Sequence, residues 1–265
     1  MSTSVKIAVI GLGEAGSLIA AGLKKAGASV IGFDPANPKN PPVPVAPTAV
    51  EAVADADIVL SINSSTVSVR VAEGVATALK PGALYADLNT GTPSMKKTLA
   101  AIVPEGSFVD VAVMKPVPGL AEKVPMGVAG AGGEKFIQLL EPYGLNLEYV
   151  SDVAGEAAAR KLLRSIVAKG MAALIIDCLW AAQSMGLEDW AIDEIKREFD
   201  SSSAATVQRY LDGTAKHAKR RQVEMADVVQ MLSEAGYDST MVAPVELTLS
   251  RVIHGKKIPF ADTRD

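Results

Sequence analysis

The chain has 265 residues, 49% of them hydrophobic, and a formal net charge of −4 at pH 7; this length suits one α/β unit followed by a smaller second unit. The negative charge, with no basic run longer than residues 219–221, argues against nucleic acid or an anionic membrane as a partner, and the lack of a recognisable signal peptide or spanning stretch favours a cytoplasmic location. A single cysteine, Cys178, excludes a disulfide framework and, with only two histidines, argues against a metal site.

The chain opens with an apolar run, residues 5–10, that leads into three glycines and then into a segment with helical spacing. Gly11 permits a tight turn, Gly13 lets the backbone approach a pyrophosphate, and Gly16 lets the helix pack on the strand. In this context the G-x-G-x-x-G pattern predicts a dinucleotide-binding turn with phosphates at the positive end of a helix, rather than an ordinary turn. The predicted contacts are the residues of this turn, Gly11, Leu12, Gly13, Glu14, Ala15 and Gly16.

A second predicted strand, residues 29–33, ends in an acidic residue, Asp34. A carboxylate at this point accepts hydrogen bonds from the hydroxyls of an adenosine ribose and repels a 2′-phosphate. The sequence therefore favours NAD over NADP as the cofactor, although Asp34 also fits the start of a plain loop.

Strand and helix patterns alternate up to residue 150, which predicts a doubly wound, mostly parallel sheet of the Rossmann type. The further strands are predicted at residues 43–45, 57–62, 84–88, 107–113, 126–129 and 147–150. Ligands collect at the carboxyl ends of such strands, where polar residues follow two of them. These candidates for the cofactor groove are Asn63, Ser64, Asn89 and Thr90, each of which a cap or a turn would also explain.

No strand pattern follows residue 155, so we predict a dinucleotide-binding domain over 1–154 and a helical substrate and dimerisation domain over 155–265. The helix predicted over 157–182 is apolar nearly all round in its second half and must be buried on every side. A helical domain of about a hundred residues has too small a core for that. The sequence therefore predicts a homodimer through the C-terminal helices, which include stretches at 188–199 and 203–235 with N-caps in the serine run 201–203.

One polar stripe interrupts the apolar surface of this long helix, because Lys161, Ser165 and Lys169 fall on one face. A lysine beside an apolar pocket loses solvation, which lowers its pKa and lets it pass a proton near neutral pH. Hydride transfer from a carbinol needs a group that takes the hydroxyl proton. Lys161 is the candidate for this role, and the alternative is a solvated helix edge.

Four segments in this order resemble the β-hydroxyacid dehydrogenase superfamily, which includes 6-phosphogluconate and 3-hydroxyisobutyrate dehydrogenases. They are the GLGEAG turn and residues 89–93, 110–113 and 155–165. Residues 220–225 are similar to a motif of one branch, the 6-phosphogluconate dehydrogenase NAD-binding proteins, whose helical C-terminal domain has no assigned function. The resemblance implies a Rossmann domain joined by a long helix to a helical, dimer-forming domain, with Lys161 as general acid/base.

The chain departs from the family pattern where substrate would bind. Ser165 stands where the family usually has asparagine, and Ala168 replaces a glutamate of 6-phosphogluconate dehydrogenases, which argues against decarboxylation of that substrate. Met114 and Lys115 replace the usual substrate loop, so a cation there implies an anionic substrate group, unless it is a plain surface charge. Arg220 and Glu224, at i and i+4, are candidates to close the pocket or to form a structural ion pair.

The sequence thus predicts an NAD-dependent dehydrogenase or reductase acting on a small anionic hydroxy acid or its carbonyl partner. An imine reductase of the same architecture and an NAD(H)-sensing protein without turnover are the alternatives. Lys161 and Asp34 argue against the first, and Lys161 with Ser165 against the second.

Overall fold

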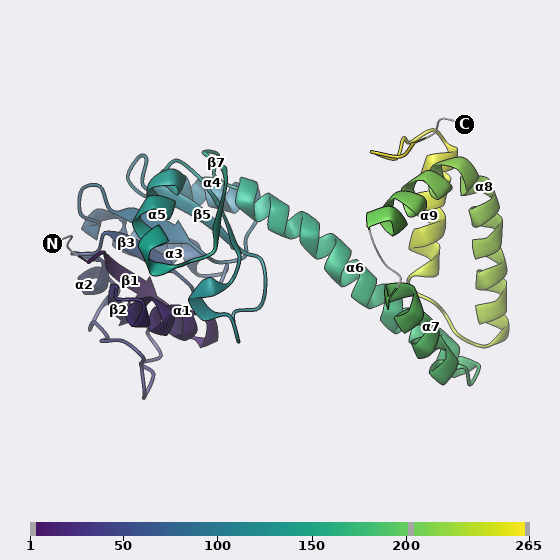
Figure 1. Cartoon of the computed structure of the whole chain (residues 1–265), viewed down its shortest axis with the longest axis horizontal. Coiled ribbons are helices and arrows are strands. Elements are labelled where there is room, and N and C mark those ends of the chain that lie inside the picture. The colour runs from purple at the N-terminus through teal and green to yellow at the C-terminus, as the bar shows by residue number, and fades with distance from the viewer. Residues whose placement is uncertain (1–3, 201–203, 263–265) are drawn as a thin grey trace. The chain divides into compact units, whose positions relative to one another are not determined.

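A computed structural model describes residues 4–200 and 204–262 of the chain. The chain divides into two compact units, Met1–Ser165 and Ile166–Asp265. The first unit is built on a sheet, and the described part of the second unit consists of helices and their connections (Figure 1). The domain boundary expected at 154/155 falls at the start of the helix that both units share, and it stays a prediction.

The first unit contains a seven-stranded sheet with the order β2-β1-β3-β4-β5-β6-β7. The strands are β1 (Lys6–Ile10), β2 (Ser29–Phe33), β3 (Ile58–Ser61), β4 (Leu84–Asp87), β5 (Phe108–Val113), β6 (Met126–Ala129) and β7 (Leu147–Ser151). All neighbours run parallel except β5 and β6. The strand order reverses between β1 and β3, and in such sheets the carboxyl ends at the reversal form the ligand-binding crevice.

Helices cover both faces of the sheet because successive side chains of a strand point to opposite sides. In β1, Ile7 and Val9 belong to one buried cluster, which takes in α1 and α5, and Ala8 and Ile10 belong to another, which takes in α2, α3 and α4. These helices are α1 (Glu14–Lys25), α2 (Ala49–Val53), α3 (Ser68–Val75), α4 (Pro93–Ile102) and α5 (Gly133–Leu140). The predicted α/β class with a doubly wound, mostly parallel sheet is confirmed.

Two local features differ from the sequence expectation. Residues 43–45 form no strand and contribute a single bridge between Val45 and Gly32. β6 runs antiparallel to β5 because a parallel neighbour needs a crossover connection, usually a helix, and the connection here holds only the 3₁₀ turn Ala121–Lys123.

The second unit consists of the end of α6 (Glu156–Ser184) with α7 (Glu188–Asp200), α8 (Ala204–Glu234) and α9 (Val242–Ile253). The long helix expected over 203–235 is kinked at His217, whose φ of −125° and ψ of 22° are not helical. The serines 201–203, expected as N-caps, lie outside the described residues. Among the helices that the structure describes, none is long and apolar enough to cross a membrane.

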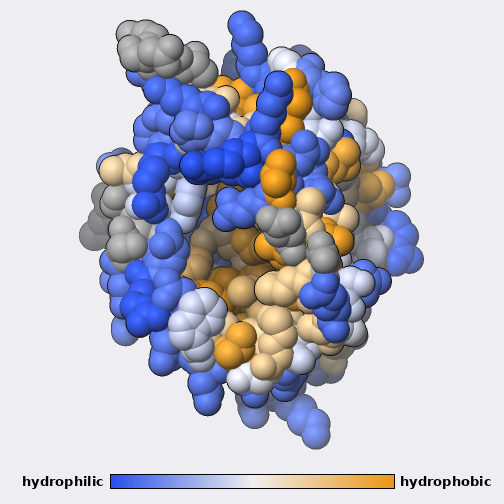
Figure 2. Space-filling model, turned by 90° about the vertical axis from the view of Figure 1, so that its right-hand side faces the viewer, coloured by the Kyte–Doolittle hydropathy of each residue, from blue (hydrophilic) through white to orange (hydrophobic). Residues whose placement is uncertain are grey.

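Many large apolar side chains of this helical unit are exposed, among them Trp180, Trp190 and Leu247 at 55% to 61%. Figure 2 looks onto it and shows hydrophobic residues gathered in and below a hollow, with hydrophilic residues mainly above it and to its left. A cavity of about 280 Å³ is lined by residues of α6, α7, α8 and α9. Asp177 of α6 accepts hydrogen bonds from Tyr237 at 2.8 Å and Ser239 at 2.5 Å, which fixes the α8–α9 connection on α6.

Candidate functional site

The three glycines of the β1–α1 turn differ in the space around them. A Cβ on Gly11, whose φ is +104°, would lie 2.1 Å from the carbonyl oxygen of Ile62, and a Cβ on Gly16 would lie 1.9 Å from the carbonyl oxygen of Gly11. Both positions must therefore be glycine for the turn to pack. A Cβ on Gly13 would meet nothing within 4 Å. The open space at Gly13, at the N-cap of α1, is where a phosphate can approach the backbone.

A cavity of about 400 Å³ opens beside this turn, between the ends of β1, β2 and β3. Four residues predicted for the cofactor line it, Gly11, Gly13, Asp34 and Asn63. The other predicted residues of the turn do not line this cavity; they are Leu12, Glu14, Ala15 and Gly16. The part of the wall that α3 contributes was missed from the sequence, because the helical pattern of α3 does not show which side faces the cavity. It consists of Arg70, Val71, Gly74 and Val75.

Asp34 is held in place by backbone hydrogen bonds. Its Oδ2 accepts from the N–H of Leu12 at 2.7 Å, and its Oδ1 accepts from the N–H of Ala36 at 2.8 Å. The side chain is only half buried, so its carboxylate joins the glycine turn to β2 and still presents oxygen lone pairs to the cavity.

The polar ends of β3 and β4 are connected through a buried amide, that of Asn89. Its Oδ1 accepts from the N–H of Asn63 at 2.7 Å, and its Nδ2 donates to Asp87 Oδ1 at 2.6 Å and to Asn63 Oδ1 at 3.1 Å. The structure therefore brings together Asn63 and Asn89, two of the residues predicted for the cofactor groove. Ser64 and Thr90, which follow them, are exposed.

The start of α6 is fixed against β5 and α4. The Oδ2 atom of Asp110 in β5 accepts from the N–H groups of Gly155 at 3.1 Å and Ala158 at 3.0 Å. Gly155 has φ +101°, and a Cβ there would lie 2.8 Å from the carbonyl oxygen of Pro93. Lys161 follows Ala158 by one helical turn and is half buried, so the network that caps α6 also sets the place of its lysine.

A buried ion cluster lies beneath these elements and was missed from the sequence. Lys96 of α4 contacts Asp87 Oδ2 at 2.6 Å and Asp110 Oδ1 at 3.2 Å, and all three side chains are at most 1% exposed. Burial raises the pKa of Asp87 and the charge of Asp110 adds to this, while Lys96 and Asn89 oppose it. The sequence held one signal for this cluster, because β4 and β5 are apolar except for one carboxylate each, Asp87 and Asp110.

The remaining predicted residues are spread over both units. Ser165 is half buried on α6, Met114 is half buried after β5, and Lys115 beside it is exposed. In the helical unit, Arg220 and Glu224 line a cavity of about 740 Å³.

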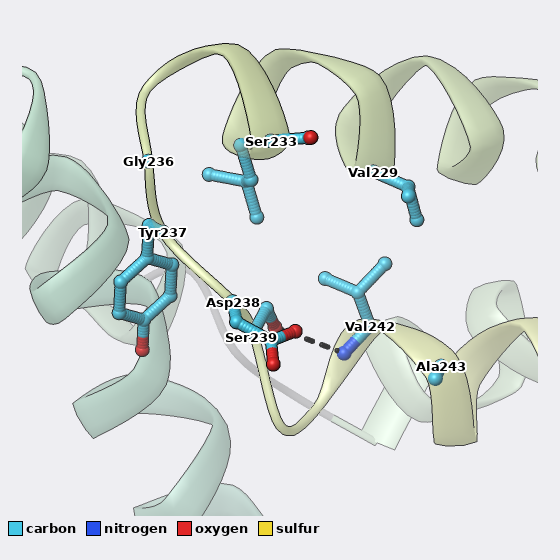
Figure 3. A pocket seen from close by; sticks show the side chains of 9 residues that line it. Val229, Ser233, Gly236, Tyr237, Asp238, Ser239, Val242 and Ala243 are labelled. Carbon is cyan, nitrogen blue, oxygen red and sulfur yellow. Dashed lines mark hydrogen bonds between the residues drawn. The ribbon is translucent and has the colours of Figure 1, made fainter.

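Another cavity of the helical unit, of about 400 Å³, lies between the end of α8 and the start of α9 (Figure 3). Ser239 Oγ accepts there from the N–H of Val242 at 3.1 Å and donates to Asp177. These polar groups satisfy the helix start and the carboxylate, which is a structural role.

Comparison with known proteins gives two matches along the chain. Residues 6–142, just over half of it, match the family described as the NAD binding domain of 6-phosphogluconate dehydrogenase. Residues 182–252 match a domain of unknown function, DUF1932. The first match covers the glycine turn, Asp34 and both asparagines, and the second covers much of the helical unit.

Individual relatives extend this picture. A conserved hypothetical protein from Sinorhizobium meliloti 1021 is 30% identical, with a TM-score of 0.64 over 100% of this chain and 93% of its own. A probable 3-hydroxyisobutyrate dehydrogenase from Mycobacterium bovis is 27% identical over 201 residues, 71% of this chain and 68% of its own.

An imine reductase from Myxococcus stipitatus, solved with NADP+, has a TM-score of 0.80 over 95% of both chains. A variant of it was solved with NAD+. At 17% identity, the likeness to this reductase concerns the fold alone.

Proposed function

The chain belongs to the family of the NAD binding domain of 6-phosphogluconate dehydrogenase, and from that premise we propose that it is an NAD-dependent oxidoreductase acting on a small hydroxy acid or its carbonyl partner. The observation that carries the proposal is the cavity beside Gly13, at the carboxyl ends of β1 and β3, with Asn63 in its wall. When bound there, the nicotinamide accepts or supplies the hydride.

The residues of the cavity fit a dinucleotide. The open space at Gly13 admits a pyrophosphate to the start of α1, where backbone N–H groups bind anions. Asp34 would accept hydrogen bonds from the ribose hydroxyls and repel a 2′-phosphate, which supports NAD over NADP. Asn63 and Asn89, which are hydrogen-bonded to each other, would border the nicotinamide.

Lys161 would move the proton of the reaction. It would take the hydroxyl proton during oxidation and return one to the oxygen during reduction. Ser165, one turn later on α6, would hydrogen-bond a substrate oxygen. Lys115 with Met114, and Arg220 with Glu224, remain candidates for binding an anionic group of the substrate.

The test is Lys161→Ala, assayed for hydride transfer with a panel of hydroxy acids and their carbonyl partners. We expect kcat to fall by about 100- to 10,000-fold, since general acid–base catalysis contributes that range. Arg160→Ala removes a neighbouring positive charge on the exposed side of α6 and is the matched control. A Lys161→Ala variant that keeps most of the rate with a good substrate contradicts the proton-transfer role.

A second candidate is reduction of an imine, which the fold of the Myxococcus stipitatus enzyme favours. Assays with cyclic imines beside hydroxy acids separate the two reactions. Tight NADH binding with no turnover of either class would instead support a sensor.

We also infer a homodimer through the C-terminal helices. Leu163, Ile166 and Val167 of α6, which share one face of the helix at i, i+3 and i+4, are 61% to 69% exposed within the chain. An exposed apolar face of this kind is typical of an interaction surface. Sedimentation of the wild type and of Ile166→Glu tests this. A wild type that sediments as a monomer at micromolar concentration contradicts the dimer.

A further inference from the structure

The buried lysine of α4 contacts two carboxylates from neighbouring strands. Its Nζ lies 2.6 Å from Asp87 Oδ2, 2.9 Å from the carbonyl oxygen of Asp87 and 3.2 Å from Asp110 Oδ1. β4 and β5 run parallel and Asp87 pairs with Asp110 in register, so the two carboxylates are adjacent at the same end of the sheet. One cation thus faces two buried anions.

Each carboxylate uses its other oxygen to hold a part of the candidate site. Asp87 Oδ1 accepts from the amide of Asn89 at 2.6 Å. Asp110 Oδ2 accepts from the N–H groups of Gly155 and Ala158 at the start of α6. Lys96 is therefore linked through Asp87 to the loop that carries Asn89, and through Asp110 to the helix that carries Lys161.

We propose that Lys96 is a positioning residue that holds Asn89 and the first turns of α6 in register, so that Lys161 meets a substrate beside the nicotinamide. The inference rests on the proposed function for the identity of the reaction. The contacts alone show that one ammonium group connects two segments far apart in the sequence.

A stabilising role by itself explains this cluster poorly. Taking two carboxylates and an ammonium out of water is costly, and apolar groups of similar volume often serve stability as well or better. What apolar groups cannot do is orient two carboxylates at once. If the cation is lost, the anions repel each other, and Asp87, whose pKa is already raised by burial, tends to take up a proton. Asn89 then loses its charged acceptor.

The first experiment needs neither cofactor nor substrate. Amide hydrogen exchange, followed by mass spectrometry of peptides, is compared between the wild type, Lys96→Met and the control Lys97→Met, which removes the exposed neighbouring lysine. We expect exchange in residues 88–92 and 155–162 of Lys96→Met to rise by roughly tenfold or more, a local opening that leaves residues 5–25 unchanged. Exchange that rises uniformly over the first unit, or nowhere, overturns the proposal.

A second variant guards against loss of the fold. Asp87→Asn with Lys96→Met removes one anion with the cation and keeps an Oδ1 acceptor for Asn89, so the charge of the cluster is unchanged while the link is broken. The same two segments should exchange faster in this variant as well. Wild-type exchange there overturns the proposal.

Kinetics gives the functional readout. Misplacement of catalytic groups should lower kcat of the double variant by about 100-fold at unchanged KM for the hydroxy acid, while the dissociation constant for NADH should rise by no more than the roughly tenfold expected for loss of the Asn89 amide. The positioning role is overturned if the fall in kcat is fully explained by the fraction of the variant that is unfolded. It is also overturned if kcat equals that of the wild type. If the wild type transfers no hydride with any substrate, the proposed function fails by itself, and the exchange experiment decides the role of Lys96.

Discussion

Asn89 accepts a hydrogen bond from the backbone N–H of Asn63 at 2.7 Å, so a side chain after β4 fixes the backbone after β3. The bond bridges the carboxyl ends of two neighbouring parallel strands, next to the point where the strand order reverses. Asn89 is 6% exposed and donates at the same time to Asp87. The geometry of the cofactor cavity near Asn63 therefore depends on a residue that does not itself line it.

Replacing that amide tests this dependence. Asn89→Ala leaves the N–H of Asn63 and the Oδ1 of Asp87 without their partner, which should cost about 1–3 kcal/mol of unfolding free energy. We also expect NADH to bind more weakly, because Asn89 no longer fixes the backbone of Asn63, which lines the cavity. A loss of about 1.4 kcal/mol of binding free energy would raise the dissociation constant about tenfold. Asn146→Ala, at an exposed loop position, is the control. Unchanged stability and binding in Asn89→Ala contradict the expectation.

The glycine turn allows stability and binding to be separated. Gly13→Ala adds a methyl group where nothing lies within 4 Å, so the thermal midpoint should stay close to that of the wild type. The same methyl group blocks the approach of a pyrophosphate, and NADH binding should weaken by about tenfold or more. Gly16→Ala should instead lower the midpoint, since its Cβ would lie 1.9 Å from a carbonyl oxygen. Equal effects of both variants on the midpoint contradict this division.

Cofactor choice depends on the charge of Asp34. Asp34→Asn keeps an oxygen that can accept from Leu12 and removes the negative charge that would repel a 2′-phosphate. The ratio of the NADP to the NAD dissociation constant should fall by about tenfold or more, mainly through tighter NADP binding. Calorimetric titration of both cofactors measures this ratio. A wild type that already binds NADP as tightly as NAD refutes the role of Asp34.

The helical unit should lose stability in acid through one carboxylate. Burial raises the pKa of Asp177, but hydrogen bonds from Ser239 and Tyr237 outweigh this, and the pKa lies below its ordinary value of 3.8. The unfolded chain therefore binds the proton first as pH falls. The stabilisation is complete above pH 3.8 and is lost as pH drops through the pKa of the folded state.

The two tryptophans, Trp180 and Trp190, lie in this unit, so their fluorescence reports its unfolding. Asp177→Asn should lower the midpoint at pH 7 by about 5 °C, and the difference from wild type should shrink below pH 3.8. Asp189→Asn, at an exposed site, should match the wild type. A difference of equal size at pH 7 and pH 2 contradicts the linkage.

Local pattern was enough to predict strands β1 to β7 and helices α1 to α5, although it also predicted a strand at residues 43–45 that forms only a bridge. A strand followed by the glycine turn, the acidic end of β2 and a polar residue after β3 are all short-range features. They predicted the sheet and four of the residues that line the cavity, Gly11, Gly13, Asp34 and Asn63. The pattern could not place the antiparallel β6, because strand direction depends on the path of the connecting loop in three dimensions.

The sequence by itself determined that three glycines, a carboxylate and two asparagines occur at the ends of strands. Only the tertiary structure decided what each of them contacts. Identical glycines differ because the neighbours of a Cβ are set by the folded chain, such as Ile62 beside Gly11, while nothing lies near Gly13. The cluster of Lys96, Asp87 and Asp110 was likewise invisible in the chain, because the partners of a buried charge are set by which strands are adjacent in the sheet and not by spacing along the sequence.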